Sequence, residues 1–146
     1  MSDLAMTRSS NGFFDLEFSR GDFVLTNSLK NCVLLSLGCW ARDEEITEVA
    51  TIEPSIGGWW GNSLEDVEIG SQIWKLFKQK LDDPTALNAA AAAEKALKWM
   101  VDDGVAKSVA ADAVINGKIL EMTVSIQKPD ASGEEFRWQI NWEDSL

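Results

Sequence analysis

Residues 109–142 of this chain read VAADAVINGKILEMTVSIQKPDASGEEFRWQINW, and this stretch decides the fold. Apolar and polar residues alternate through residues 120–127 and again through residues 136–142, which is typical of strands with one dry face and one wet face. Asn116-Gly117 predicts a type I′ turn of two residues between the first two strands. The resulting register places three apolar pairs opposite each other: Ala113 and Leu120, Ala111 and Met122, Val109 and Val124. We therefore predict a three-stranded antiparallel meander.

Two helices are predicted in the first half of the chain. Asn27 or Ser28 caps the first helix, which ends near Ala41. Its apolar residues recur at helical spacing: Leu29, Val33, Leu37 and Trp40. Gly70-Ser71 starts the second helix. Its apolar stripe consists of Ile73, Trp74, Phe77 and Leu81. Each helix therefore has one face to bury.

The third predicted helix runs from Asp83-Pro84 to Gly104. Aspartate is a favoured cap, proline is favoured in the first turn, and glycine commonly ends a helix. Its apolar face is thin because alanine buries little area: Ala86, Ala90, Ala93, Leu97 and Met100. We expect this helix to cover the dry face of the meander. The expected contacts are those of Leu97 and Met100 with Val124 and Trp138.

A short hairpin is predicted near the N-terminus, where residues 13–18 and 22–26 alternate loosely around Ser19-Arg20-Gly21. No internal repeat or linker divides the chain. The predicted fold class is α+β, with three main helices packed on a C-terminal antiparallel three-stranded meander, plus the short N-terminal hairpin. We expect residues 1–146 to form a single domain, in which residues 1–12 are flexible.

The composition restricts the partners of the protein. Thirteen basic residues against 24 acidic residues give a net charge of −11, which disfavours nucleic acid and anionic membranes and favours basic or neutral proteins. Residues 1–12 hold no apolar signal region, and Cys32–Ala41 is about half a membrane span. We therefore expect a soluble protein made in a cytoplasm. Cys32 and Cys39 lie about 10 Å apart on one predicted helix, beyond disulfide reach, and are expected to be reduced core residues.

The residues that carry most enzyme chemistry are missing from the sequence. It contains no histidine, which excludes the usual nucleophilic triad and leaves a zinc site with carboxylates alone. The glycines of residues 57–61 lack the lysine and the helix start of a phosphate-binding loop. A glycosidase needs two carboxylates, and Glu53 or Glu121 is conceivable in that role. Among 24 acidic residues such a pair carries little information, so we predict no catalytic, cofactor or metal site.

Residues 57–62, Gly-Gly-Trp-Trp-Gly-Asn, are the most unusual feature of the chain. The glycines permit a sharp bend, so one indole can anchor the loop on the core while the other meets a partner. Burial of both rings is the alternative. Asp102-Asp103 lies at the negative end of the third helix, which indicates either a function or chance placement on the surface. Four other tryptophans are expected in the core, and Trp142 is left undecided: Trp40, Trp74, Trp99 and Trp138.

The same elements resemble a known family. The segments that match are Gly57–Asn62, Gly70–Leu76, Ala96–Trp99 and Asp103–Ala106, within a resemblance that runs from about Asp15 to about Ile140. They are similar to the Mu-type baseplate tail protein of phages, a relative of the contractile-tail baseplate wedge proteins sometimes labelled lysozyme-like. The GGWWGN and GS-x-x-W elements are specific in combination and weak singly.

The resemblance implies a structural subunit of a contractile phage tail baseplate. It implies six-fold copies around the tail tube, contacts with other baseplate wedge proteins, and contacts with the first ring of tail sheath subunits. The sheath contact would form by strand addition at an open sheet edge. Tail tube and spike-hub proteins are further partners that fit. The implied location is the virion tail baseplate, with assembly in the host cytoplasm.

The chain departs from the wider wedge family at one motif. That family carries Glu-Pro-Arg at the end of its long helix, where this chain has Asp102-Asp103-Gly104, so no contact of the arginine carries over. The predicted interface residues are Trp59, Trp60, Gly61, Asn62, Asp102, Asp103 and Gly104. Two alternative functions stay open at this point, a peptidoglycan-cleaving lysozyme-like enzyme and an acidic cytoplasmic binding module.

Overall fold

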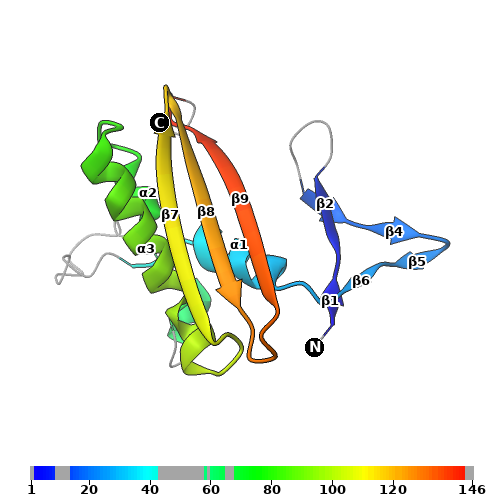
Figure 1. Ribbon diagram of the computed structural model, residues 1–146. Helices are drawn as coiled ribbons and strands as arrows, with labels where there is room; N and C mark the ends of the chain where they lie inside the picture. The colour runs from blue at the N-terminus through cyan, green and yellow to red at the C-terminus, as the bar shows by residue number, and fades with distance from the viewer. Residues whose placement is uncertain (1, 9–13, 43–57, 59, 65–67, 144–146) are drawn as a thin grey trace. The chain divides into compact units, whose positions relative to one another are not determined.

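The computed structural model describes residues 2–8, 14–42, 58, 60–64 and 68–143 (Figure 1). The chain divides into two compact units, Met1–Val33 and Leu34–Leu146, which are described in turn. In the described residues no helix combines the length and the apolar character needed to cross a lipid bilayer. The expectation of a single domain stays a prediction.

The smaller unit consists of short antiparallel strands. They are β1 Asp3–Leu4, β2 Met6–Arg8, β3 Phe14–Leu16, β4 Phe18–Ser19, β5 Asp22–Phe23 and β6 Leu25–Thr26, paired as β1–β6, β2–β3 and β4–β5. The predicted hairpin is confirmed at its turn by β4 and β5, joined through Arg20 and Gly21, which both have positive φ as a type I′ turn requires. The outer parts of the two predicted strands pair elsewhere, β3 with β2 and β6 with β1. Part of the segment expected to be flexible lies in β1 and β2. Between these two strands, the Ala5 N–H donates to the Val24 carbonyl, and the Ala5 carbonyl accepts from the Glu17 N–H.

The first helix, α1 (Lys30–Gly38), spans the division between the units. The first backbone bond of this helix runs from the Val33 N–H to the Leu29 carbonyl, which places Leu29 at the cap position instead of Asn27 or Ser28. The Ser28 Oγ accepts a hydrogen bond from the Lys30 N–H at 3.2 Å just before the helix. Cys32 and Cys39 are free thiols, as predicted, but both are half-buried. Burial, followed by the nearby Asp3 carboxylate, raises the pKa of the Cys32 thiol.

The second predicted helix is much shorter than expected. A 3-10 helix forms at Trp60–Ser63, and α2 then covers only Ile73–Leu76. Beyond α2, two carbonyl groups accept hydrogen bonds from side chains. The Trp142 Nε1–H donates to the Gln79 carbonyl at 2.9 Å, and the Thr85 hydroxyl donates to the Lys80 carbonyl at 2.8 Å. The chain therefore turns before α3 instead of continuing the helical stripe.

The third predicted helix is confirmed as α3 (Asp83–Asp102), with its cap one residue earlier than expected. Asp82 has an extended backbone, and its carboxylate accepts a hydrogen bond from the Thr85 N–H at 3.0 Å. Hydrogen bonds from the Thr85 side chain and backbone lower the pKa of the Asp82 carboxyl below its ordinary value. Pro84 occupies the first turn, where its missing N–H costs no hydrogen bond.

The C-terminal meander is confirmed. It consists of β7 (Ser108–Asn116), β8 (Ile119–Gln127) and β9 (Gly133–Asn141) in the order β7-β8-β9. The predicted register between the first two strands was wrong by two residues. The observed pairs are Ala113 with Met122, Ala111 with Val124 and Val109 with Ile126. The turn is Gly117-Lys118, in which Gly117 alone has a positive φ, so it is of the Gly-X type II′ form. A shift of two residues leaves every side chain on its predicted face.

The core of the larger unit lies on the dry face of this sheet. Helix α3 runs alongside β7 and contacts it far more than it contacts β8 (Figure 1). The core cluster contains Ile73, Leu76, Ala86, Ala89, Ala93, Leu120, Met122 and Trp142. Trp142, which the sequence left undecided, is buried with its ring edge against Phe77. The helix-on-sheet architecture is therefore confirmed, while the specific contacts expected for Leu97 and Met100 stay a prediction.

Leu97 tests this packing because its side chain is completely buried on α3. We expect Leu97→Ala to lower the free energy of unfolding by about 2–5 kcal/mol, since the substitution leaves a cavity in the core. Leu87→Ala is the matched control, because Leu87 lies on the same helix and is 70% exposed. Urea unfolding of both variants measures the difference. Equal small effects would mean that Leu97 is not part of a packed core.

Candidate functional site

The Gly-Ser-Gln-Ile-Trp motif of residues 70–74 binds the end of α1 to the rest of the larger unit. Gly70 has a φ of +126°, and a Cβ atom placed on it would lie 2.7 Å from the Ala41 nitrogen and 2.8 Å from the Trp40 carbonyl carbon. Real Cβ atoms do not come this close to a backbone. Glycine is therefore required on two independent grounds, conformation and space.

The remaining polar groups of the motif hydrogen-bond to the last turn of α1 and to the segment that follows it. Ser71 and Trp40 form a parallel bridge, in which the Ser71 N–H donates to the Cys39 carbonyl at 2.9 Å. Three side chains donate to further carbonyl groups: Ser71 Oγ to Leu37 at 2.8 Å, Gln72 Nε2 to Arg42 at 3.1 Å and Trp74 Nε1 to Ala41 at 3.0 Å. We call residues 37–42 and 70–74 together the GSQIW junction. The motif that carries the family resemblance is thus explained by local structure.

The tryptophan-rich loop is only partly within the described residues. Trp59 lies outside them, and the side chain of Trp60 is also outside, although its backbone begins the 3-10 helix. Gly61 is buried. The amide of Asn62 makes two bonds to Ile69: Asn62 Nδ2 donates to its carbonyl at 3.2 Å, and Asn62 Oδ1 accepts its N–H at 2.9 Å. Asn62 therefore holds the loop against the residue that precedes Gly70.

The predicted acidic site at the end of α3 has local partners. Lys98 forms an ion pair with Asp102 one helical turn away, with both side chains more than half exposed. This cation offsets the unfavourable position of a carboxylate at the negative helix end. The Asp103 N–H donates to the Trp99 carbonyl at 2.9 Å, and Gly104 ends the helix with a φ of +72°. These contacts give each of the three residues a structural role that requires no bound ligand.

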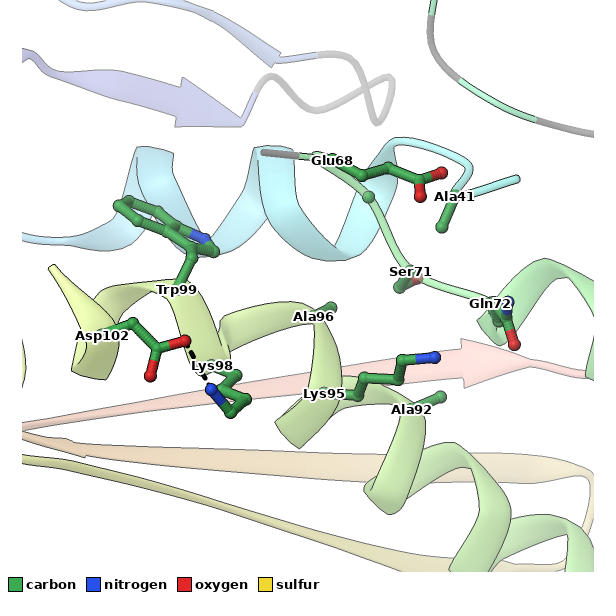
Figure 2. A pocket seen from close by; sticks show the side chains of 11 residues that line it. Ala41, Glu68, Ser71, Gln72, Ala92, Lys95, Ala96, Lys98, Trp99 and Asp102 are labelled. Atoms are coloured by element: carbon green, nitrogen blue, oxygen red, sulfur yellow. Dashed lines mark hydrogen bonds and ion pairs between the residues drawn. The ribbon is translucent and has the colours of Figure 1, made fainter. Parts of the chain in front are cut away.

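A pocket of about 320 Å³, which we call the α3 pocket, lies between α3 and the GSQIW junction (Figure 2). Its lining residues are Ala41, Glu68, Gly70, Ser71, Gln72, Ala92, Lys95, Ala96, Lys98, Trp99 and Asp102. The Trp99 Nε1–H donates to the Ser36 Oγ at 3.0 Å, and the Glu68 carboxylate accepts the Arg42 N–H at 2.7 Å. Of the predicted interface residues that the structure describes, Asp102 alone lines this pocket.

Charged groups of the α3 pocket already have partners within the protein. Its Lys98 and Asp102 side chains neutralise each other, and its Glu68 carboxylate already accepts a backbone N–H. No group of three or more acidic or cysteine side chains suited to a metal ion occurs among the described residues. Glu121, considered as a glycosidase carboxylate, lies on the open face of the sheet and accepts a hydrogen bond from Gln139. Glu53 lies outside the described residues.

An apolar groove lies on the other side of the GSQIW junction, and we call it the tryptophan groove. It has a volume of about 290 Å³. Its lining residues are Leu34, Leu37, Gly38, Trp40, Ser71, Ile73, Trp74, Phe77, Met122, Trp138, Gln139 and Ile140. Trp40 and Trp74 stack with ring centroids 5.3 Å apart and planes 16° apart. Both walls of the groove thus present aromatic or aliphatic surface.

Trp40 was wrongly expected in the core, since it is 51% exposed. The bridge to Ser71 fixes its backbone beyond the end of α1, so its ring packs on Trp74. Trp74, Trp99 and Trp138 are half-buried. Sequence reasoning missed the groove because it treated each tryptophan as part of its own helix or strand. The available signal was the presence of Trp40 and Trp74 at the ends of two predicted helices.

The two edges of the meander differ in their hydrogen bonding. Bonded and non-bonded pairs alternate along an antiparallel ladder, and the pair that flanks a two-residue turn is bonded. Asn116 and Ile119 flank this turn, so the odd-numbered residues of β7 direct their backbone groups outward. One of these groups is occupied, because the Ala111 N–H donates to the Glu94 Oε1 at 2.9 Å.

The outer edge of β9 is open by comparison. The Trp142 N–H donates to the Lys118 carbonyl at 3.0 Å. The even-numbered residues of β9 therefore bond to β8, and its odd-numbered residues direct their backbone N–H and C=O groups outward. Within the described part of the chain, the outward groups of Glu135, Arg137 and Gln139 have no hydrogen-bond partner. This row of donors and acceptors is what a further strand can pair with.

Comparisons with known proteins identify relatives over most of this chain. The family model described as phage protein GP46 matches residues 29–133. The Mu-like prophage FluMu protein gp46 of Haemophilus influenzae is 36% identical over 146 residues, which cover 97% of this chain and 98% of the relative. The baseplate protein gp46 of Escherichia phage Mu is 31% identical over 134 residues, 90% of this chain and 91% of the relative.

The close contact at Gly70 gives a direct test of the GSQIW junction. We expect Gly70→Ala to lower the free energy of unfolding by more than about 2 kcal/mol, because the added Cβ meets backbone atoms that cannot move independently. Gly117→Ala is the matched control: its φ is also positive, but no atom lies within 4 Å of the added Cβ. Its cost should be that of the backbone conformation alone, about 1–2 kcal/mol. Thermal or urea unfolding that ranks the two variants equally would contradict the steric argument.

Proposed function

The chain belongs to the phage protein GP46 family, and from this premise we propose that it is a structural subunit of a contractile phage tail baseplate. The observation that carries the proposal is the 31% identity to the baseplate protein gp46 of phage Mu over 90% of this chain. The protein would act in the virion tail after assembly in the host cytoplasm. Its direct partners would be other baseplate wedge proteins and the first ring of sheath subunits.

The sheath contact would form by strand addition at β9. This choice of edge is supported by the outward backbone groups of Glu135, Arg137 and Gln139 and by the Glu94 carboxylate on the opposite edge. A sheath segment beside β9 would extend the antiparallel sheet from three strands to four. Each baseplate copy would then offer one starting edge to the sheath.

The wedge contact would use the tryptophan-rich loop and the end of α3. The proposed residues are Trp59, Trp60, Gly61, Asn62, Asp102, Asp103 and Gly104. The bonds of Asn62 to Ile69 support a role in shaping the loop, which leaves the indoles as the candidates for partner contact. Asp102 and Asp103 are exposed and could meet a basic partner side chain.

A proline at the β9 edge tests strand addition. We expect Arg137→Pro to prevent sheath attachment while leaving the β8–β9 ladder intact, because the residue 137 N–H points outward. Arg137→Ala is the control, since it removes the side chain and keeps the N–H. Complementation of a phage that lacks this protein, followed by electron microscopy of its tails, measures the result. Normal sheaths on the proline variant would contradict the proposed edge.

Alanine substitutions of Trp59 and Trp60 test the loop. If one indole serves a partner, its replacement should leave the isolated protein folded and stop its incorporation into baseplates. The expected loss is about 2 kcal/mol or more per contact, a decrease of about thirtyfold in affinity. Thermal melting beside an assembly assay separates this result from core packing. Unfolding of both variants would remove the interface claim for this loop.

A cell-wall assay tests the enzymatic alternative. The purified protein should leave the turbidity of a peptidoglycan suspension unchanged, because the sequence has no histidine and no distinctive carboxylate pair. Hen-type lysozyme serves as the positive control. A loss of turbidity that one Asp or Glu substitution abolishes would establish catalysis and contradict the structural role.

A further inference from the structure

We propose that the tryptophan groove receives a large apolar side chain from the strand that adds to β9, and that this side chain sets the register of the added strand. The inference rests on the strand addition proposed above and states what the incoming segment must contain. That segment is an extended peptide with a large apolar residue on its dry side and basic residues on its flanks.

The position of the groove links it to the open edge. Trp138, Gln139 and Ile140 line the groove from β9, while Leu34, Leu37 and Gly38 line it from α1. In an added strand, alternate side chains lie on the same face as Trp138 and Ile140. One of these side chains therefore enters the space between β9 and α1. Main-chain bonds at an edge supply affinity in this mode of recognition, and side-chain pockets supply specificity.

The lining of the groove selects an apolar occupant. Two polar side chains of the lining have their hydrogen bonds inside the protein, Ser71 Oγ with Leu37 and Trp74 Nε1 with Ala41. The Gln139 side chain bonds to Glu121 on the opposite face of the sheet. Trp40 leaves 51% of its surface exposed beside them. An apolar cavity of about 150 Å³ holds a benzene molecule, so a groove of about 290 Å³ has room for one large side chain.

The open edge and the net charge determine which partner fits. A helix laid in the groove would leave the outward N–H and C=O groups of Glu135, Arg137 and Gln139 unpaired, whereas a strand pairs them. A second copy of this chain would bring together two molecules that each carry a charge of −11. A basic extended segment of the sheath subunit satisfies both conditions.

Gly38 allows the groove to be filled without touching the edge. It lines the groove, and a Cβ placed on it meets no atom within 4 Å. We expect Gly38→Phe to weaken binding of the purified sheath subunit of the same phage by about tenfold or more, because the added ring occupies the groove. Gly38→Ala leaves the groove open and should bind like the natural protein. Binding is measured by calorimetry with the full-length chains.

Hydrogen exchange of the β9 amides distinguishes this proposal from the one on which it rests. At saturating sheath subunit, exchange at Glu135, Arg137 and Gln139 should slow in both the natural protein and Gly38→Phe. Unchanged affinity of Gly38→Phe with protected amides would overturn the groove proposal and leave strand addition standing. Unprotected amides in the natural protein would overturn both.

Two further measurements complete the test. If Gly38→Phe lowers the unfolding midpoint, Trp40→Ala replaces it, because this half-exposed ring forms a wall of the groove. Its affinity should fall by a similar factor, and unchanged affinity would overturn the proposal.

Sedimentation of the protein alone tests a second copy as the occupant. A dimer that Gly38→Phe dissociates, without any effect on sheath binding, would also overturn it.

Discussion

The larger unit depends on a backbone contact that only glycine permits. At Gly70 the chain passes so close to residues 39–41 that a methyl group would overlap their backbone atoms. Because the two segments touch here, the side chains of Ser71, Gln72 and Trp74 reach three carbonyl groups at and beyond the end of α1. The α3 pocket and the tryptophan groove both include Ser71 in their linings. The close backbone contact at Gly70 thus positions a residue that lines both the pocket and the groove.

The meander and the alanine-rich helix could be predicted because their signals are local. Alternation with period two and a helix cap are contained in short stretches, and tertiary packing did not override them. The register was predicted wrongly because the Asn116-Gly117 signal for a type I′ turn did not hold. Gly117 alone takes a positive φ, so the turn lies one residue further on, at Gly117-Lys118. The segment after α2 is also held by a distant residue, because the indole of Trp142 donates to a carbonyl 63 positions away, at Gln79.

The pocket and the groove were harder to predict because they are assembled from distant segments. Trp40 and Trp74 become one stacked wall only after the GSQIW junction forms. The GS-x-x-W element was correctly singled out, but its polar groups form hydrogen bonds that stabilise the fold. A single sequence cannot distinguish residues of this kind from residues that bind a partner. Asp102 was singled out because a carboxylate is unfavourable at the C-terminal end of a helix. Its ion pair with Lys98 offsets this cost, and the spacing of four residues in the sequence is compatible with such a pair.

The Glu94 carboxylate on the β7 edge has a consequence for how assembly can propagate. A sheet with two open edges can be joined on both sides and can grow into an endless ribbon, as in fibres. Here α3 lies alongside β7, and Glu94 holds the Ala111 N–H. A strand that pairs with β7 would have to displace Glu94 from Ala111, whereas a strand that pairs with Glu135, Arg137 and Gln139 on β9 would displace no such bond. The carboxylate therefore makes the two edges of the sheet unequal as places where a strand could be added.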